Sequence, residues 1–159
     1  MRKIDLLLEE YGESHRNETN KLIHWVCVPA IFFSVVGLIF SIPSAFLMEL
    51  LPFIGNFANW ATFALLFVLI YYLSLSVPLT LGMLLYASFC LALANFLQIL
   101  FPGKLGLISI GVFVIAWILQ FYGHKIEGKK PSFLKDLQFL LIGPAWLLHF
   151  IYKRIGIAY

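Results

Sequence analysis

The chain has four histidines, and they lie at the two ends of a long apolar tract. His15 and His24 precede this tract, His124 and His149 follow it, and Glu49 lies within it. Neutral imidazole is the commonest metal ligand in proteins, and it suits Zn, Cu, Fe and Ni alike. A site without cysteine argues against structural zinc, which usually recruits thiolate. We therefore predict that the four histidines bind a metal ion.

The spacing of the first two histidines requires a break in the helix. His15 and His24 are nine residues apart, which is about 900° on a continuous helix and places them on opposite faces. Asn17 is a good N-cap, so the polar run that follows it predicts a helix start there. With a break at this point, His15 can fold back and meet His24. Asn20 lies one turn before His24 and could hydrogen-bond to the site.

The second half of the site is expected around His124. Gln120 and His124 form an i, i+4 pair, and Glu127 follows three residues later. Polar residues on one stripe at the end of an apolar helix are candidates for function. Glu127 is expected to form a local ion pair with a following lysine, Lys129 or Lys130, and not to be a metal ligand. The candidate catalytic residues are Tyr11, Asn20, Gln120 and Glu127, although for Tyr11 and Gln120 we favour packing or support of the ligands over a catalytic role.

The composition determines which elements must position these residues. The sequence is 62% hydrophobic with a mean hydropathy of +0.93, against about 45–50% apolar residues in a soluble protein. We predict an all-α integral membrane protein whose residues 1–159 form one domain. The charged N-terminal segment does not fit a cleavable signal peptide. Cys27 and Cys90 are expected to be buried without forming a disulfide. No pattern indicates nucleic acid, and the excess lysines indicate contact with lipid headgroups.

Four stretches have the length and apolarity of membrane-spanning helices, which need about 20 residues. A short interfacial helix is expected between the first and second, at Ser44–Phe57, and a tight hairpin at Val77–Pro78. The predicted spans are Ile23–Ile42, Ala58–Val77, Leu79–Leu100 and Leu105–Tyr122.

Most Lys and Arg residues lie in 1–22 and 124–135, so both segments are expected to face the cytoplasm. Four crossings then bring His15, His24 and His124 to one membrane face. The final stretch, Leu137–Tyr152, is short and contains Gly143–Pro144, so we predict an interfacial or half-inserted helix that bends there and returns His149 to the same face.

Two groups of motifs resemble those of a family of small membrane proteins related to the yeast protein that converts phytosphingosine to odd-numbered fatty acids. The motifs are Tyr11-Gly-Glu-Ser-His15, Asn17-x-x-Asn20-Lys-Leu-Ile-His24-Trp, Val28-Pro29, Gln120-Phe-x-Gly-His124-x-x-Glu127-Gly-Lys-x-Pro131 and Gly143-Pro144. The N-terminal motif and the compact length resemble bacterial members, which implies the bacterial inner membrane, or the endoplasmic reticulum membrane in a eukaryote.

The resemblance implies a function for the predicted site. It implies an Fe(II)-dependent dioxygenase that acts on 2-hydroxy fatty acids with molecular oxygen and shortens the acyl chain by one carbon (α-oxidation). The implied iron ligands are His15, His24 and His124, with His149 as a fourth candidate. Substrate carboxylate and hydroxyl would chelate the iron, the acyl tail would lie among Phe and Leu side chains, and a lysine would hold the carboxylate. The candidates for this last role are Lys125, Lys129 and Lys130.

Three other classes of protein remain open from the sequence. A zinc-dependent membrane hydrolase, or a di-metal hydroxylase, could use a similar site, although di-metal enzymes usually need more histidines. A non-enzymatic membrane protein could use the same histidines to cap helices or to contact lipid, as single interfacial histidines often do. A haem protein with two axial histidines would show a Soret band.

Overall fold

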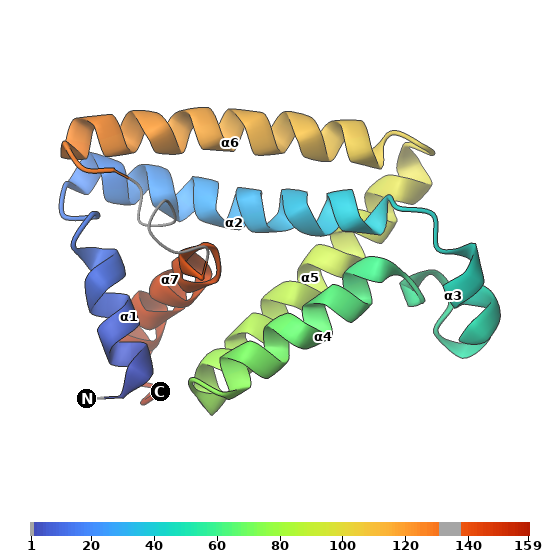
Figure 1. Ribbon diagram of the computed structural model, residues 1–159, viewed down its shortest axis with the longest axis horizontal. Helices are drawn as coiled ribbons and strands as arrows, with labels where there is room; N and C mark the ends of the chain where they lie inside the picture. Colours follow the sequence, from blue (N-terminus) through green and yellow to red (C-terminus); the bar gives the residue numbers. More distant parts are fainter. Residues whose placement is uncertain (1, 131–137) are drawn as a thin grey trace.

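The computed structural model describes residues 2–130 and 138–159, and this part of the chain is helical apart from its turns and termini (Figure 1). This confirms the predicted all-α fold. The helices in chain order are α1 (Lys3–Gly12), α2 (Glu18–Phe40), α3 (Ala45–Leu50), the 3₁₀ helix η1 (Pro52–Phe57), α4 (Trp60–Leu73), α5 (Val77–Leu100), α6 (Leu105–Glu127) and α7 (Phe139–Ile155).

Among the described residues, three helices are long and apolar enough to cross a membrane. These are α2, α5 and α6, with 23, 24 and 23 residues, and they indicate an integral membrane protein. The second predicted span, Ala58–Val77, differs from the prediction because α4 has only 14 residues. At 1.5 Å per residue, α4 is about 21 Å long, against about 30 Å of hydrocarbon.

Polar caps determine where these helices begin. The Asn17 side chain accepts hydrogen bonds from the backbone N–H groups of Thr19 and Asn20, so α2 starts where the sequence predicts. Asn59 caps α4 in the same way. The Ser76 side chain caps α5, and the turn between Leu73 and Val77 is the predicted tight hairpin. This turn and the Asn59 cap together limit the length of α4.

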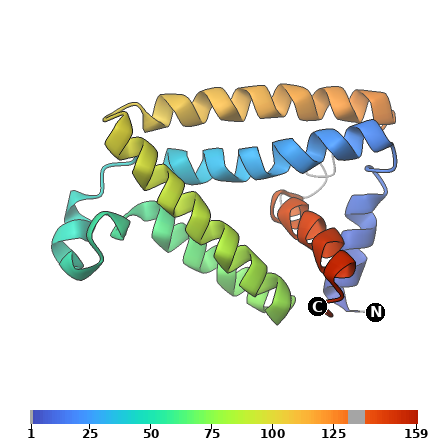
Figure 2. The same ribbon diagram turned by 180° about the vertical axis from the view of Figure 1, so that it is seen from behind.

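Two helix pairs define the arrangement. Helices α2 and α6 run antiparallel and side by side along the molecule, while α4 and α5 form a second antiparallel pair that crosses them obliquely (Figures 1 and 2). Helices α3 and η1 occupy the predicted Ser44–Phe57 segment at the end opposite α1. Helices α1 and α7 pack together near the N-terminal end of α2. The starts of α2 and α7, the end of α1 and the end of α6 therefore meet at one end of the molecule.

Three tyrosines join the helix pairs through hydroxyl groups that donate to backbone carbonyls. Tyr86 of α5 donates to Pro29 of α2 at 2.7 Å, and Tyr152 of α7 donates to Pro78 of α5 at 2.6 Å. Tyr72 of α4 donates to Leu141 of α7. Each phenol thus finds an acceptor inside the apolar interior, where a hydroxyl without a hydrogen-bond partner would be costly.

The C-terminal segment is not broken at Gly143–Pro144 as predicted. Described from residue 138, it forms one helix, α7, that runs through Pro144, while residue 137 of the predicted segment lies outside the described residues. Gly143 serves close packing here. A Cβ at this position would lie 3.0 Å from the Tyr11 hydroxyl and 3.2 Å from a Val28 methyl group. The glycine therefore lets α1 and α2 approach α7.

Candidate metal centre

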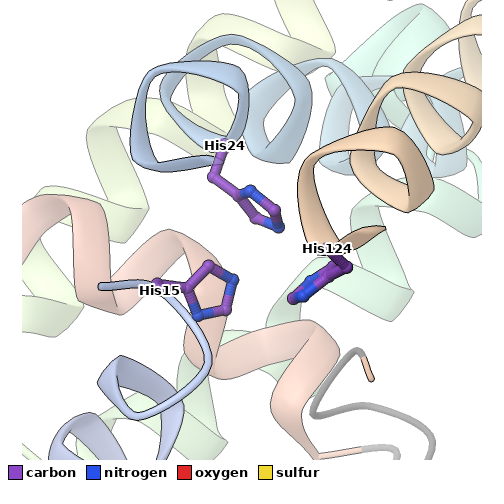
Figure 3. Close-up of side chains that lie close together, drawn as sticks. All are labelled: His15, His24 and His124. Carbon is purple, nitrogen blue, oxygen red and sulfur yellow. The ribbon is translucent and has the colours of Figure 1, made fainter. Parts of the chain in front are cut away.

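Three of the four histidines meet at the end of the molecule where α1, α2, α6 and α7 come together. His15 lies in the loop between α1 and α2, His24 on α2 and His124 on α6, and their rings point toward one another (Figure 3). One nitrogen from each ring can be chosen so that all three lie within 4.8 Å of one another. The three residues are 2%, 1% and 4% exposed. The sequence prediction of a convergent histidine cluster is confirmed for these three.

The hydrogen bonds of the rings leave nitrogen atoms available for a ligand. Nδ1 of His15 lies 2.6 Å from the Tyr11 carbonyl oxygen, and Nδ1 of His24 lies 2.9 Å from the Asn20 carbonyl oxygen. If each Nδ1–H donates to its carbonyl, each Nε2 presents a lone pair. Within the described part of the chain, His15 Nε2 and His124 Nδ1 are buried without a hydrogen-bond partner.

Such a donor set fits a metal ion. Metal-binding histidines commonly donate the other ring N–H to a carbonyl or carboxylate, which fixes the tautomer and the ring orientation. A buried polar atom without a partner is costly, and coordination would satisfy it. The three histidines could therefore hold one metal ion.

Burial keeps the His15 ring neutral. It lowers the pKa of His15 to about 3, and the neighbouring His24 contributes in the same direction. Neutral imidazole is the form that binds metals. Tyr11 stacks on the His15 ring at 4.2 Å between centroids, and burial raises the pKa of its phenol above the usual value, so Tyr11 stays protonated beside the cluster.

Glu127 fixes the loop that carries His15. Its carboxylate accepts hydrogen bonds from the backbone N–H groups of Arg16 and Asn17, at 2.9 and 2.8 Å, and from Asn20 Nδ2 at 3.2 Å. The expected ion pair with Lys129 or Lys130 is wrong: in the described residues, Lys129 Nζ instead donates to the Glu13 carbonyl at 2.9 Å. We call these bonds of Glu127 and Lys129 to residues 13–20 the α6 clamp.

Asn20 links this clamp to both helices of the site. Besides Glu127, its Nδ2 donates to the Ser14 carbonyl at 3.0 Å, and its own carbonyl lies at His24 Nδ1. The side chain is fully buried. It lies directly against Gly123, where a Cβ would come within 2.4 Å of Asn20 Oδ1. Gly123 thus permits the close approach of α2 and α6 just before His124, a role that the sequence analysis missed.

His149, the fourth predicted ligand, is not brought into the cluster. Its ring packs at 5.1 Å from Phe150 and 5.4 Å from Tyr159, and its Nδ1 pairs with the Tyr159 hydroxyl. The prediction relied on a bend at Gly143–Pro144, and the continuous α7 carries His149 away from the other three. Trp146 of α7 does reach the cluster, because its ring centroid lies 5.2 Å from that of His15.

An apolar cavity of about 430 Å³ opens from the three histidines. It runs between α2, α4, α6 and the first turns of α7. Tyr11 and Gln120 line it beside the histidines, and the rest of its wall is almost wholly hydrophobic. The three lysines predicted to hold a carboxylate are exposed and are not part of this wall; they are Lys125, Lys129 and Lys130.

Together, the long apolar helices and the buried histidines define a helical membrane protein with a candidate metal centre at the mouth of an apolar cavity. Residues 1–155 match the family described as "2-hydroxy-palmitic acid dioxygenase Mpo1-like", and the chain belongs to this family. It is 29% identical over 147 residues to 2-hydroxy-palmitic acid dioxygenase MPO1 of Saccharomyces cerevisiae, covering 90% of this chain and 76% of the yeast protein. No solved structure matches the chain.

Proposed function

We propose that the protein is an Fe(II)-dependent dioxygenase that shortens 2-hydroxy fatty acids by one carbon. The observation that carries the proposal is the set of three buried imidazoles, His15, His24 and His124, at the polar end of an apolar cavity. Membership of the 2-hydroxy-palmitic acid dioxygenase family supports this choice of reaction. Bound there, Fe(II) would bring the 2-hydroxy acid and molecular oxygen together and supply the redox chemistry.

The charges around the site favour an acidic substrate. Three neutral imidazoles add no negative charge, and no lysine, arginine, aspartate or glutamate belongs to the described wall of the cavity. A divalent ion buried there would keep a positive charge, which is costly unless an anion accompanies it. The carboxylate of a 2-hydroxy acid would supply this anion, and its neighbouring hydroxyl would complete a chelate. The predicted lysine contact is not needed in this arrangement.

The polar residues around the cluster take separate roles in this proposal. Gln120 lines the cavity one helical turn from His124, where its amide could hydrogen-bond to the substrate headgroup. Tyr11 stacks on His15 and, as a neutral phenol, holds that ring in place. Asn20 and Glu127 are positioning residues, because they contact the His15 loop and the backbone near His24, not the cavity. His149 has no role as a ligand.

We also propose four membrane crossings, with the histidine end at the cytoplasmic face of a bacterial inner membrane. Helices α2 and α6 are antiparallel neighbours, so the chain between them must leave and return to the far side. Helices α4 and α5 form that excursion, and α4, although short, accompanies the full-length α5. The lysines and arginines of residues 1–22 and 124–135 favour the cytoplasm for the histidine end.

The test is the metal content and activity of the purified full-length protein, prepared without chelator under reductant. We expect about one iron per chain and oxygen consumption with 2-hydroxypalmitic acid. Both should be lost together in His24→Ala and His124→Ala, whereas His149→Ala is the matched control and should retain both. Stoichiometric zinc without oxygen consumption would replace the proposal by a hydrolase. No metal, even after anaerobic Fe(II) loading, would refute a metal enzyme altogether.

A further inference from the structure

The cavity follows one face of α2 away from the histidines. The residues of α2 that line the cavity recur three or four positions apart and therefore share one face of the helix. The lining residues of α6 have the same spacing, and they lead from Phe113 to His124. The α2 residues are His24, Val28, Ile31, Phe32, Val35, Val36 and Ile39, and the α6 residues are His124, Gln120, Trp117 and Phe113. From His24 to Ile39 the path is 15 residues, or about 22 Å along the helix axis. The cavity is therefore long and narrow, with one polar end.

At the far end of the cavity α4 crosses α2. Ala61 and Leu65 of α4 pack in one buried cluster with Val36 and Phe40 of α2, and small residues of α5 complete the cluster. Ala61, Ala64, Leu65 and Val68 contribute the α4 wall of the cavity. Two of these four are alanines, so this crossing leaves space that a larger side chain would fill.

The length of this path can be compared with that of an acyl chain. An extended chain of single bonds advances about 1.2 Å per bond, as the polypeptide backbone does when it covers roughly 3.3–3.6 Å in three bonds. A path of about 22 Å thus accommodates on the order of 18 bonds. A long saturated chain whose headgroup lies at the histidines would end at the crossing of α2 and α4.

We propose that this crossing determines the acyl-chain length of the substrate. Ala64 and its neighbour Ala61 set the longest acyl chain that the protein accepts. The inference rests on the proposed function, because it places the headgroup at the histidines. Its ligand is the acyl chain of a 2-hydroxy fatty acid of about 16–18 carbons. A larger side chain introduced nearer the histidines should then restrict the protein to shorter acyl chains. The closer the substituted residue lies to His24, the shorter the longest acyl chain that is accepted.

Two variants test the order. Ala64→Leu adds three carbons at the far end, and Ile31→Trp narrows the path about 10 Å from His24. Leu66→Phe is the matched control, since Leu66 lies on the same helix, is 51% exposed and does not line the cavity. For each Fe(II)-loaded protein in nanodiscs, kcat/KM and the anaerobic Kd are measured for 2-hydroxyoctanoic, 2-hydroxydodecanoic and 2-hydroxypalmitic acids. Comparing each variant with wild type for the same acids cancels the partition of the acids into lipid.

Ala64→Leu should lower kcat/KM for 2-hydroxypalmitic acid relative to 2-hydroxydodecanoic acid at least tenfold, because one misplaced methylene in an apolar pocket already costs about 10–200-fold. Ile31→Trp should penalise the dodecanoic acid as well and spare only the octanoic acid. Leu66→Phe should leave the ratios unchanged.

If the ratios of kcat/KM between the three acids were the same in the wild type and in all three variants, the inference would be overturned and the proposed function would stand. If no protein consumes oxygen, the proposed function fails, and the anaerobic Kd values still decide the inference: they must show the same order of lengths. If one of the two variants does not fold, the other alone must shift the ratio for the inference to survive. Absence of binding of any acid to the wild-type protein would overturn both.

Discussion

Glu127→Gln is the substitution that tests whether the α6 clamp holds the metal centre together. The wild-type carboxylate accepts two backbone N–H groups, from Arg16 and Asn17, and the Asn20 amide. Glutamine keeps one acceptor oxygen, turns an NH₂ group toward a donor and removes the charge. Hydrogen bonds to charged groups contribute about 1.5–3 kcal/mol each, but the two backbone donors are exposed and can bond to water instead. The net loss is therefore about 2–3 kcal/mol.

This loss should appear in metal affinity, because the clamp holds the loop that carries His15. With the clamp weakened, the loop of residues 13–17 loosens in the metal-free protein and His15 moves away from His24 and His124. Metal binding must then also order this loop, which lowers the affinity. Removal of a residue that orients a metal ligand typically costs about 10–100-fold in affinity, and 2–3 kcal/mol corresponds to a similar range. The expected result is thus a Kd for Fe(II) raised by one to two orders of magnitude.

The assay is an anaerobic Fe(II) titration of the full-length protein in nanodiscs. Glu10→Gln is the matched control: it makes the same change of charge on an exposed residue of α1, and it should bind Fe(II) as the wild type does. Circular dichroism should show that both variants keep their helices. An unchanged affinity in Glu127→Gln would refute the reasoning, since the clamp would then contribute nothing to the position of His15.

Two further predictions follow from the same site. Gly123→Ala should lower stability by about 1–3 kcal/mol, because the new Cβ would lie 2.4 Å from Asn20 Oδ1; Gly111→Ala meets nothing within 4 Å and should not destabilise the protein in thermal unfolding. In the metal-free protein, burial lowers the pKa of His15 from 6.5 to about 3. Between these two pH values the unfolded chain binds a proton that the folded His15 does not, so stability should be full above pH 6.5 and fall by up to about 1.4 kcal/mol per pH unit on acidification. His15→Asn should flatten that slope, and equal slopes in the two proteins would contradict the assignment.

Local rules of helix formation predicted the parts of the site that depend on neighbouring residues. The Asn17 cap was expected from residue type alone, and it places the break that lets His15 meet His24. The i, i+4 spacing of Gln120 and His124 likewise put both side chains on the wall of one cavity. Such features were accessible because a cap or a helical face involves only residues within about one turn.

The errors arose where distant parts of the chain decide the outcome. The apolar pattern of the second predicted span continues through residues that in the structure form the Asn59 cap at one end and the turn after Leu73 at the other. Helix α4 is therefore shorter than the predicted span. The position of His149 depended on a bend at Gly143–Pro144, but Gly143 instead accommodates Tyr11 and Val28. Proline and glycine together suggest a turn, whereas packing of α7 against α1 and α2 favours a continuous helix.

The charges near Glu127 show most clearly why sequence proximity was misleading. Two lysines follow Glu127 closely, and an exposed ion pair between such neighbours contributes little, about 0–1 kcal/mol. Backbone N–H groups at the start of α2 offer a better partner, because they carry the positive end of the helix dipole and otherwise lack helical acceptors. No residue type marks these donors in the sequence. The carboxylate therefore binds the start of α2, and Lys129 is left to bond the Glu13 carbonyl on the other side of the same loop.

The charged side chains lie outside the cavity and the neutral histidines lie at its end, and this arrangement explains how an apolar cavity can bind an acidic headgroup. The lysine and glutamate at the end of α6 hold the His15 loop from outside, while the cavity wall presents only neutral groups. An acid entering from the membrane would find no cation among the described wall residues, and its carboxylate would be costly to bury without one. Only protein that already holds a metal ion should therefore bind the acid tightly. The α6 clamp therefore affects substrate binding indirectly. It positions His15 for the metal ion, and the charge of that ion offsets the cost of burying the carboxylate.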